Sequence, residues 1–292
     1  MSETVREIAS QPAMWARGAA QAEASAGLLP AAGERVAAIG CGTSWFICQA
    51  YASLRETRGL GETDPFTATE FPMRRRYDRA ILLSRSGTTT EVARLAGALA
   101  GVTPTLAISA VPGTPVPSLA DEALWLDFAD ESSVVQTRFA TTALALLRSH
   151  LGEDLSQVIA DGHRAVDAPL GPNVTAFDHF VFLGHGWSVG LANEAALKLR
   201  EAAQANTEAY PAMEYRHGPI SLAGPRSLVW ILATPDLSVA EDVRATGATV
   251  RTAELDPMAE LVLIQRTAVA LANARGLDPD RPRHLTRSVV LS

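Results

Sequence analysis

Basic residues, cysteines and long apolar runs are all scarce in this sequence of 292 residues. The two cysteines, Cys41 and Cys48, lie on one predicted turn and helix, which does not suggest a disulfide framework and fits a reducing compartment. No uninterrupted apolar stretch reaches the roughly 18 residues of a membrane-spanning helix, and the first residues lack the pattern of a signal peptide. We therefore expect a cytoplasmic protein with no membrane partner.

The charge balance narrows the choice of partner. Lysine and arginine number 25 against 32 aspartates and glutamates, which gives a formal net charge of -7. Duplex nucleic acids bind to basic faces, so no nucleic acid is expected as a partner. A small anion is compatible with this balance, because backbone N–H groups, hydroxyls and a helix N-terminus can hold a phosphate locally. No spacing typical of metal ligands is evident, and no cofactor is expected.

The remaining composition predicts a globular chain, since 47% of the residues are hydrophobic. The length fits two ordinary domains better than one. A stretch at 167–173 contains proline and glycine and is interpreted as a linker. We expect an N-terminal helical segment at 1–28, a first domain at 29–168 and a second domain at 169–292.

Short apolar runs alternate with helical patterns, which is typical of a parallel sheet with helices between its strands. The opening helix is expected to break at Pro12 and to end near Gly27. The expected strands of the first domain are 35–40, 79–83, 105–109 and 123–127. The helices expected among and after them are 45–56, 91–100 and 136–166.

The second half of the sequence repeats a pattern of the first half. Residues 179–201 repeat the plan of residues 35–56, with a strand, a G-x-G turn, a hydroxyl and a long helix in the same order. We interpret this similarity as an internal duplication, so two related halves are expected.

The first of two hydroxyl-bearing loops, at 40–44, joins a strand to a helix. Free N–H groups and the positive end of the helix dipole meet at such a turn, which favours an anion. The loop lacks the third glycine of a dinucleotide-binding fingerprint, and no acidic residue ends the next strand. On its own it indicates a tight structural turn as readily as a phosphate site.

The second loop, at 84–90, reads Ser-Arg-Ser-Gly-Thr-Thr-Thr and precedes Glu91 and a helix. Its hydroxyls can donate to several oxygens of one phosphate, and Gly87 lets the backbone approach closely. A helix cap with Glu91 as its capping-box partner is the alternative. One cap needs one hydroxyl and this loop has five, so phosphate binding is the better interpretation.

Together the two loops resemble the paired phosphate loops of the sugar isomerase (SIS) domain family, in which a strand, S-x-S-G-x-T and a helix follow one another. The resemblance implies an α/β protein of two tandem flavodoxin-like three-layer αβα domains with parallel sheets. It implies that phosphate is bound by Gly42, Thr43, Ser44, Ser84, Ser86 and Thr89. Arg85 stands where many relatives have glutamine and would add charge to the pocket.

The long helix of the second half carries Glu194, Lys198 and Glu201 on one face. This spacing fits a ladder of surface ion pairs, and it fits equally a site in which a base lies beside a cation. Aldose–ketose isomerisation needs one carboxylate to move a proton between C1 and C2, a role open to Glu201. Spacing alone favours the surface ladder.

Residues 194–223 closely resemble the catalytic segment in the isomerase half of glucosamine-6-phosphate synthase. The resemblance implies that Glu201 is the proton-transferring base, that Lys198 lies beside it and that His217 helps to open the sugar ring. In that family the matching histidine loop reaches into the partner subunit's site. A homodimer in which His217 reaches the neighbouring subunit's site is therefore implied.

Some positions depart from the synthase. No N-terminal cysteine nucleophile or glutaminase domain precedes the first half, so ammonia release from glutamine is not expected. Arg287 stands where the synthase has an imine-forming lysine, and arginine forms no Schiff base, although it could bind a sugar oxygen. Val134 and Gln136 fall where relatives have a further sugar-lining turn, and Gln136 takes a position often held by serine. In this respect the stretch resembles the amino-sugar isomerase and deaminase branch.

We therefore expect an enzyme that interconverts the aldose and ketose forms of a phosphorylated amino sugar and releases ammonia where the substrate is aminated. A deglycase that cleaves a phosphorylated fructosamine is the alternative enzyme. A phosphosugar sensor without catalysis is the alternative from another class, and the sequence has no evident helix-turn-helix or basic segment to support it.

Overall fold

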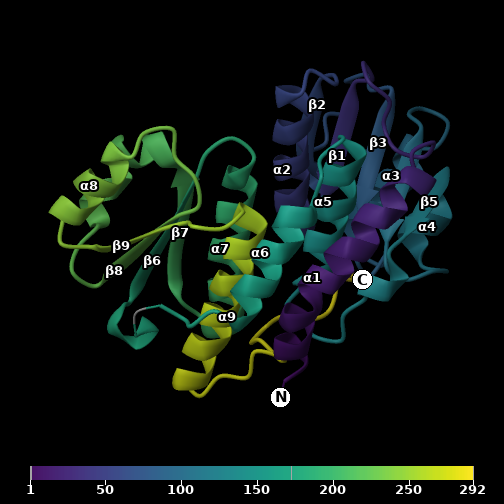
Figure 1. The fold of residues 1–292 in the computed structure, drawn as a ribbon. Helices are drawn as coiled ribbons and strands as arrows, with labels where there is room; N and C mark the ends of the chain where they lie inside the picture. The colour runs from purple at the N-terminus through teal and green to yellow at the C-terminus, as the bar shows by residue number, and fades with distance from the viewer. Residues whose placement is uncertain (1, 172, 292) are drawn as a thin grey trace. The chain divides into compact units, whose positions relative to one another are not determined.

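The computed structural model describes residues 2–171 and 173–291, so position 172 of the expected linker lies outside the description, as do positions 1 and 292. It contains two parallel sheets, which confirms the expected α/β class (Figure 1). The chain divides into two compact units. We call residues 10–155 with 285–291 the hydroxyl-loop unit, and residues 2–9 with 156–284 the carboxylate unit.

The sheet of the hydroxyl-loop unit has five parallel strands in the order β2-β1-β3-β4-β5, which is the flavodoxin-like order. Its strands are β1 (Val36–Gly40), β2 (Thr63–Thr67), β3 (Arg79–Leu83), β4 (Thr105–Ser109) and β5 (Glu122–Trp125). Its helices are α2 (Thr43–Thr57), α3 (Thr90–Leu99), α4 (Pro115–Leu119), α5 (Arg138–His150) and, from residue 10 onward, α1 (Glu3–Ala24). Short 3-10 turns lie at Ala68–Glu70 and Asp127–Ala129.

Helices cover both faces of this sheet. Strands β1 and β4 are buried at every position, as expected for strands between two helical layers. Ile39 and Leu82 pack on one face with Val92 and Leu95 of α3. Helix α2 packs on β1 and β2 and against α5, which supplies the layer on the other face (Figure 1).

The sheet of the carboxylate unit has four parallel strands in the order β7-β6-β8-β9. Its strands are β6 (His179–Gly184), β7 (Asn206–Pro211), β8 (Ser227–Ile231) and β9 (Thr249–Thr252). Its helices are α6 (Ser156–Asp167), α7 (Ser188–Ala203), α8 (Ser238–Ala245) and α9 (Pro257–Ala274), with 3-10 turns at Val174–Ala176, Ala212–Arg216 and Pro219–Leu222. Val181 and Val229 pack with α8 on one face, and α7 and α9 pack together on the other (Figure 1).

Helix α1 runs through Pro12, where the sequence predicted a break. Proline removes one N–H group and therefore one helical hydrogen bond. Tertiary contacts on both sides of it hold the helix together, because Gln11 accepts a hydrogen bond from Thr141 Oγ1 at 2.8 Å and Trp15 Nε1 donates to the same oxygen at 2.8 Å. Tertiary packing thus offsets the loss of one helical hydrogen bond at Pro12.

The single helix expected at 136–166 is two helices, α5 and α6, and Gly152 lies between them with a positive φ of 84°. Helix α6 packs against α9. The compact units therefore divide between residues 155 and 156, earlier than the division after residue 168 that the sequence suggested. No helix within the described residues is both long and apolar enough to cross a membrane.

Candidate active site

The first hydroxyl-bearing loop turns sharply from β1 into α2, and glycine is required at two of its positions. An ideal Cβ on Gly40 would lie 2.6 Å from the carbonyl carbon of Ser44, and Gly42 has a φ of 55°. Thr43 and Ser44 begin α2 and are both buried. Burial raises the pKa of the Cys41 thiol between the glycines, so this cysteine is poorly suited to act as a thiolate nucleophile.

The second loop leaves the sheet at the same end, the carboxyl ends of the strands, because β3 is parallel and adjacent to β1. Thr89 is the N-cap position of α3, and Ser84 and Ser86 are buried. Ser86 Oγ accepts hydrogen bonds from the backbone N–H of Thr88 at 3.2 Å and from its hydroxyl at 3.0 Å. The fold thus brings the glycine turn and the five-hydroxyl loop, predicted separately from the sequence, to one edge.

The C-terminal segment 285–291 belongs to this unit and contacts the second loop. The backbone N–H of Thr90 donates to Val289 O at 3.1 Å, and the hydroxyls of Thr88 and Ser288 lie 2.7 Å apart. Arg287 Nη2 lies 2.5 Å from Asp130 Oδ1, and both side chains are partly exposed. Arg287 is therefore held beside the second loop.

The turn predicted to line the sugar lies just before α5. Val134 O accepts a hydrogen bond from Arg85 Nη2 at 3.5 Å, and Gln136 Oε1 is buried with no hydrogen-bond partner among the described residues. Glu131 opens this turn and is fully buried; it accepts hydrogen bonds from the N–H groups of Thr137 at 2.6 Å and Arg138 at 2.8 Å. Its carboxylate thereby accepts hydrogen bonds from the free backbone N–H groups at the start of α5, a role that the sequence did not reveal.

The three charged residues of α7 do not form a surface ladder. Lys198 and Glu194 have side chains that are 1% exposed, and that of Glu201 is 19% exposed. Lys198 Nζ lies 2.5 Å from Glu201 Oε2 and 3.4 Å from Glu194 Oε1. Because exposed pairs are commonplace and buried ones are not, this geometry excludes a surface ladder and is compatible with a base placed beside a cation.

His217 follows β7 and a 3-10 turn, and its side chain is exposed. The turn is well anchored: Tyr215 is fully buried, and burial raises its pKa to about 12. Arg216 Nε lies 2.6 Å from Asp242 Oδ2, and Arg216 Nη2 donates to Ser238 Oγ at 2.5 Å. The imidazole is thus presented to solvent on a turn that these contacts hold in place.

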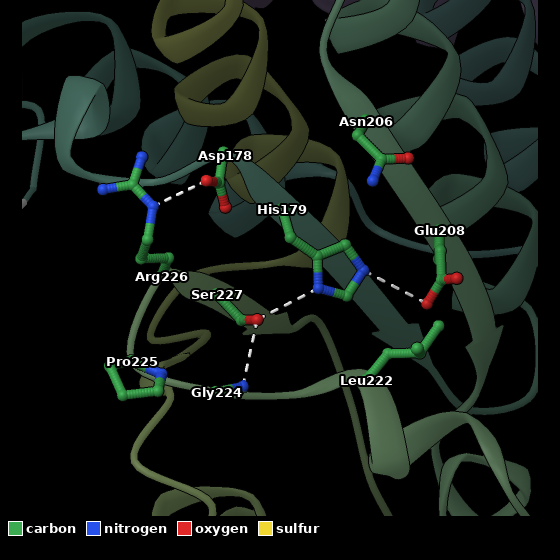
Figure 2. A pocket seen from close by; sticks show the side chains of 9 residues that line it. All are labelled: Asp178, His179, Asn206, Glu208, Leu222, Gly224, Pro225, Arg226 and Ser227. Carbon is green, nitrogen blue, oxygen red and sulfur yellow. Dashed lines mark hydrogen bonds and ion pairs between the residues drawn. The ribbon is translucent and has the colours of Figure 1, made fainter.

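A pocket of about 390 Å³ lies at the amino ends of β6, β7 and β8, and the sequence analysis missed it (Figure 2). His179 Nδ1 lies 3.0 Å from Ser227 Oγ, and its Nε2 lies 3.3 Å from Glu208 Oε2. Both ring nitrogens therefore have neighbours, one from each adjacent strand. We interpret the cluster as a tie between three strands; no sequence motif could reveal it, because its members come from three separate segments.

No protein-family model matches the chain. Among curated proteins, it is 29% identical over 316 residues to the isomerizing glutamine–fructose-6-phosphate aminotransferase of Gloeobacter violaceus, which covers 88% of this chain and 52% of the relative. The corresponding protein of Methanothermobacter thermautotrophicus is 28% identical, with the same coverage of 88% and 52%. The chain spans about half the length of these curated relatives.

Solved structures share the fold. Glucosamine-6-phosphate deaminase from Thermotoga maritima matches with a TM-score of 0.87 and 24% identity, over 99% of this chain and 100% of that chain. Tagatose-6-phosphate ketose/aldose isomerase from Escherichia coli matches with a TM-score of 0.81 and 20% identity, over 100% of this chain and 96% of that one. Together with the curated relatives, these matches confirm the predicted resemblance to the SIS family and to the isomerase half of the synthase.

Proposed function

We propose that this chain is a phosphosugar isomerase or deaminase that acts on a phosphorylated amino sugar. The observation that carries the proposal is the pairing of Lys198 with Glu201 on a helix that resembles the catalytic helix of the synthase. The hydroxyl loops at one edge of the first sheet support the phosphate part of the proposal. The curated relatives, which are named as isomerizing aminotransferases of a sugar phosphate, support the choice of substrate class.

The phosphate ester would be held by the hydroxyl-loop unit. Two helices, α2 and α3, begin at the ends of adjacent parallel strands, so their free N–H groups and dipoles favour an anion at that edge. Hydroxyls can donate to the ester oxygens without bringing a positive charge. The proposed phosphate residues are Gly42, Thr43, Ser44, Ser84, Ser86 and Thr89, with Val134 and Gln136 lining the sugar.

The proton would be moved by Glu201. Lys198 Nζ, at 2.5 Å, holds one carboxylate oxygen, and the partial exposure of Glu201 leaves its carboxylate accessible to a substrate. A carboxylate in this setting can take a proton from one sugar carbon and return it to the neighbouring one. His217 would assist ring opening by proton transfer to the ring oxygen, and Arg287 would bind a sugar oxygen rather than form an imine.

The two units are proposed to be tandem SIS domains, and matched loop geometry supports this. An ideal Cβ on Gly184 would lie 2.5 Å from Ser188 O, much as one on Gly40 would meet Ser44. Gly186 has a φ of 54° and Gly42 a φ of 55°. We propose further that the protein is cytoplasmic and acts as a homodimer, in which His217 serves the neighbouring subunit's site.

The test is turnover with glucosamine, galactosamine and fructosamine phosphates, measured as ammonia release and as keto-sugar formation. Glu201→Gln keeps the size of the side chain and removes the base, so an isomerase should lose about 100-fold or more in kcat while still binding its substrate. Glu241→Gln, an exposed position on α8, is the matched control and should keep full activity.

Other results would redirect the proposal. Release of a free amino acid from a phosphorylated fructosamine would make the protein a deglycase. Binding of sugar phosphates without turnover in the unmodified protein, and unchanged binding in Glu201→Gln, would make it a sensor.

A further inference from the structure

Arg85 is the second residue of the proposed phosphate loop at 84–90, yet its guanidinium is directed to other parts of the unit. The side chain is 2% exposed. Its Nη1 donates to Ser133 O at 3.0 Å, and its Nη2 donates to Arg287 O at 2.9 Å. The residue therefore joins three segments that are far apart in the sequence: its own loop, the turn at 131–135 and the C-terminal segment.

Carbonyl oxygens accept the hydrogen bonds that this buried cation donates. Glu131 is the nearest acidic group, but its Oε2 lies 3.8 Å from Arg85 Nη1. The Glu131 carboxylate is engaged at the first turn of α5, where Oε1 accepts three hydrogen bonds and Oε2 accepts one from the N–H of Phe139 at 3.2 Å. Arg85 Nε is buried with no hydrogen-bond partner among the described residues. Loss of the Arg287 carbonyl would leave the guanidinium further under-satisfied.

The C-terminal segment has its own bonds to the same loop, and they report on its docking. Thr90 N–H donates to Val289 O at 3.1 Å, and Leu291 N–H donates to Thr90 Oγ1 at 2.9 Å. Neither bond involves Arg85. Exchange of these two amides therefore measures whether the segment is docked, independently of the side chain that is changed.

We infer that Arg85 is a positioning residue, which couples the C-terminal segment 285–291 and the turn at 131–135 to the phosphate loop. The inference rests on the proposed function for its catalytic consequence, because it concerns the same site. Undocking the segment breaks a charge-assisted hydrogen bond, so the guanidinium adds to the stability of the docked state. A glutamine at this position has one amide with two donors and no charge, and it cannot span two carbonyls in the same fork.

Hydrogen exchange of the intact protein tests the coupling directly. We expect Arg85→Gln to speed exchange of the Thr90 and Leu291 amides by about ten- to a hundredfold, since a hydrogen bond to a charged group is lost. Arg85→Lys keeps the charge and loses the fork, so its two amides should exchange faster than in the parent and more slowly than in Arg85→Gln. Arg76→Gln, an exposed arginine of the same unit, should leave both amides unchanged. Unchanged exchange in Arg85→Gln would overturn the inference, whether or not the enzyme turns over any sugar.

A truncation distinguishes positioning from direct contact with phosphate. The probe is inorganic phosphate, titrated into the full chain and into a chain ending at Thr286, each with and without the Arg85→Gln substitution. If Arg85 acts through the segment, Arg85→Gln weakens phosphate binding in the full chain and has little further effect in the shortened one. An equal loss in both chains would show that Arg85 contacts the phosphate itself and would refute the positioning role. For an active enzyme, we expect Arg85→Gln to lower kcat more than it raises KM, because the parts of the site are present and poorly aligned.

Discussion

Lys198 is a buried cation with two carboxylates beside it. Its ammonium lies 2.5 Å from one carboxylate and 3.4 Å from another while its side chain is 1% exposed. Removing one member of a buried ion pair leaves the remaining charge uncompensated. We predict that Lys198→Met lowers the free energy of unfolding by about 3 kcal/mol. Urea denaturation followed by circular dichroism would measure the loss.

An exposed pair in the same unit is the control for this prediction. Arg226 and Asp178 form an ion pair whose side chains are 66% and 59% exposed. Such pairs are worth about 0–1 kcal/mol, so Arg226→Ala should change stability by no more than that. If Lys198→Met and Arg226→Ala lowered the free energy of unfolding equally, Lys198 and Glu201 would not form a buried ion pair in solution.

The sequence identifies these residues but not their surroundings. The spacing of Glu194, Lys198 and Glu201 is the same in a surface ladder and in a buried site. The tertiary burial of Lys198 and Glu194, whose side chains are 1% exposed, decides between them. For Arg85, the loop pattern predicts a donor beside a phosphate. The partners that draw it away, Ser133 O and Arg287 O, come from distant segments, which no local pattern can reveal.

The turn between β3 and α3 depends on Gly87. This residue has a φ of 65°, and an ideal Cβ on it would lie 2.0 Å from Thr114 Oγ1. Gly87→Ala should therefore lower the free energy of unfolding by about 1 kcal/mol or more and weaken binding of inorganic phosphate. Calorimetric titration with phosphate and urea denaturation would measure the two effects.

A glycine inside helix α3 provides a control in which the same substitution should raise stability. Gly97 lies inside this helix with open space around its Cα, so an added methyl group meets nothing within 4 Å. Gly97→Ala should raise stability by about 0.5–1 kcal/mol, because alanine favours a helix interior. A loss at Gly97 similar to that at Gly87 would show that the effect is not specific to the turn.

The start of β5 is held to β4 by a reciprocal pair. Asp121 Oδ2 accepts hydrogen bonds from the Thr105 N–H and the Thr105 hydroxyl, both at 2.8 Å, and the Asp121 N–H donates to Thr105 Oγ1 at 2.9 Å. The side-chain hydrogen bond from Thr105, followed by the backbone one, lowers the pKa of Asp121. A carboxyl whose folded pKa is depressed stabilises the fold above its unfolded pKa of about 3.9 and loses that contribution as the pH falls through the folded value.

We therefore predict that Asp121→Asn is less stable than the parent at pH 7. The difference should shrink as the pH falls below about 4. Urea midpoints of both proteins between neutral and acidic pH would measure it. A difference that stays constant over this range would show that ionisation of Asp121 contributes nothing.

The sequence predicted central strands and one edge strand, β5, which was expected at 123–127 and spans Glu122–Trp125, but it missed the other three edge strands. β1, β3, β4 and β6 lie within one residue of their expected positions, because central parallel strands are continuous apolar runs. β2, β7 and β9 were missed; each lies at the edge of its sheet and is largely half-buried. Edge strands pair on one side only, so their sequences carry polar residues and even a proline, as at Pro65.

At the scale of the whole molecule, chain order is a poor guide to which residues pack together. Residues 285–291 form part of the hydroxyl-loop unit, although more than a hundred residues of the carboxylate unit separate them from Leu155. The sequence predicted two halves from the repeated strand–turn–helix plan. It did not predict that the last segment returns to the first half, since that return depends on bonds to Thr88 and Thr90.

Assembly of two subunits gives the final prediction, which rests on the proposed function. If His217 serves the neighbouring subunit's site, Glu201→Gln and His217→Asn are each inactive as homodimers. A mixed dimer then holds one site with both substitutions and one site with neither. Random exchange of subunits makes half of the dimers mixed, so an equimolar mixture should recover about a quarter of the parent activity.

The exposed His217 and its anchored turn make this exchange a clean test, because His217→Asn removes an imidazole from the surface without disturbing Tyr215 or Arg216. Subunit exchange would be verified with differently tagged copies of the two variants. If exchange is complete and activity does not return, His217 acts within its own subunit or not at all. A chain that sediments as a monomer while turning over substrate would exclude the shared site, since a site completed by a second subunit cannot work alone.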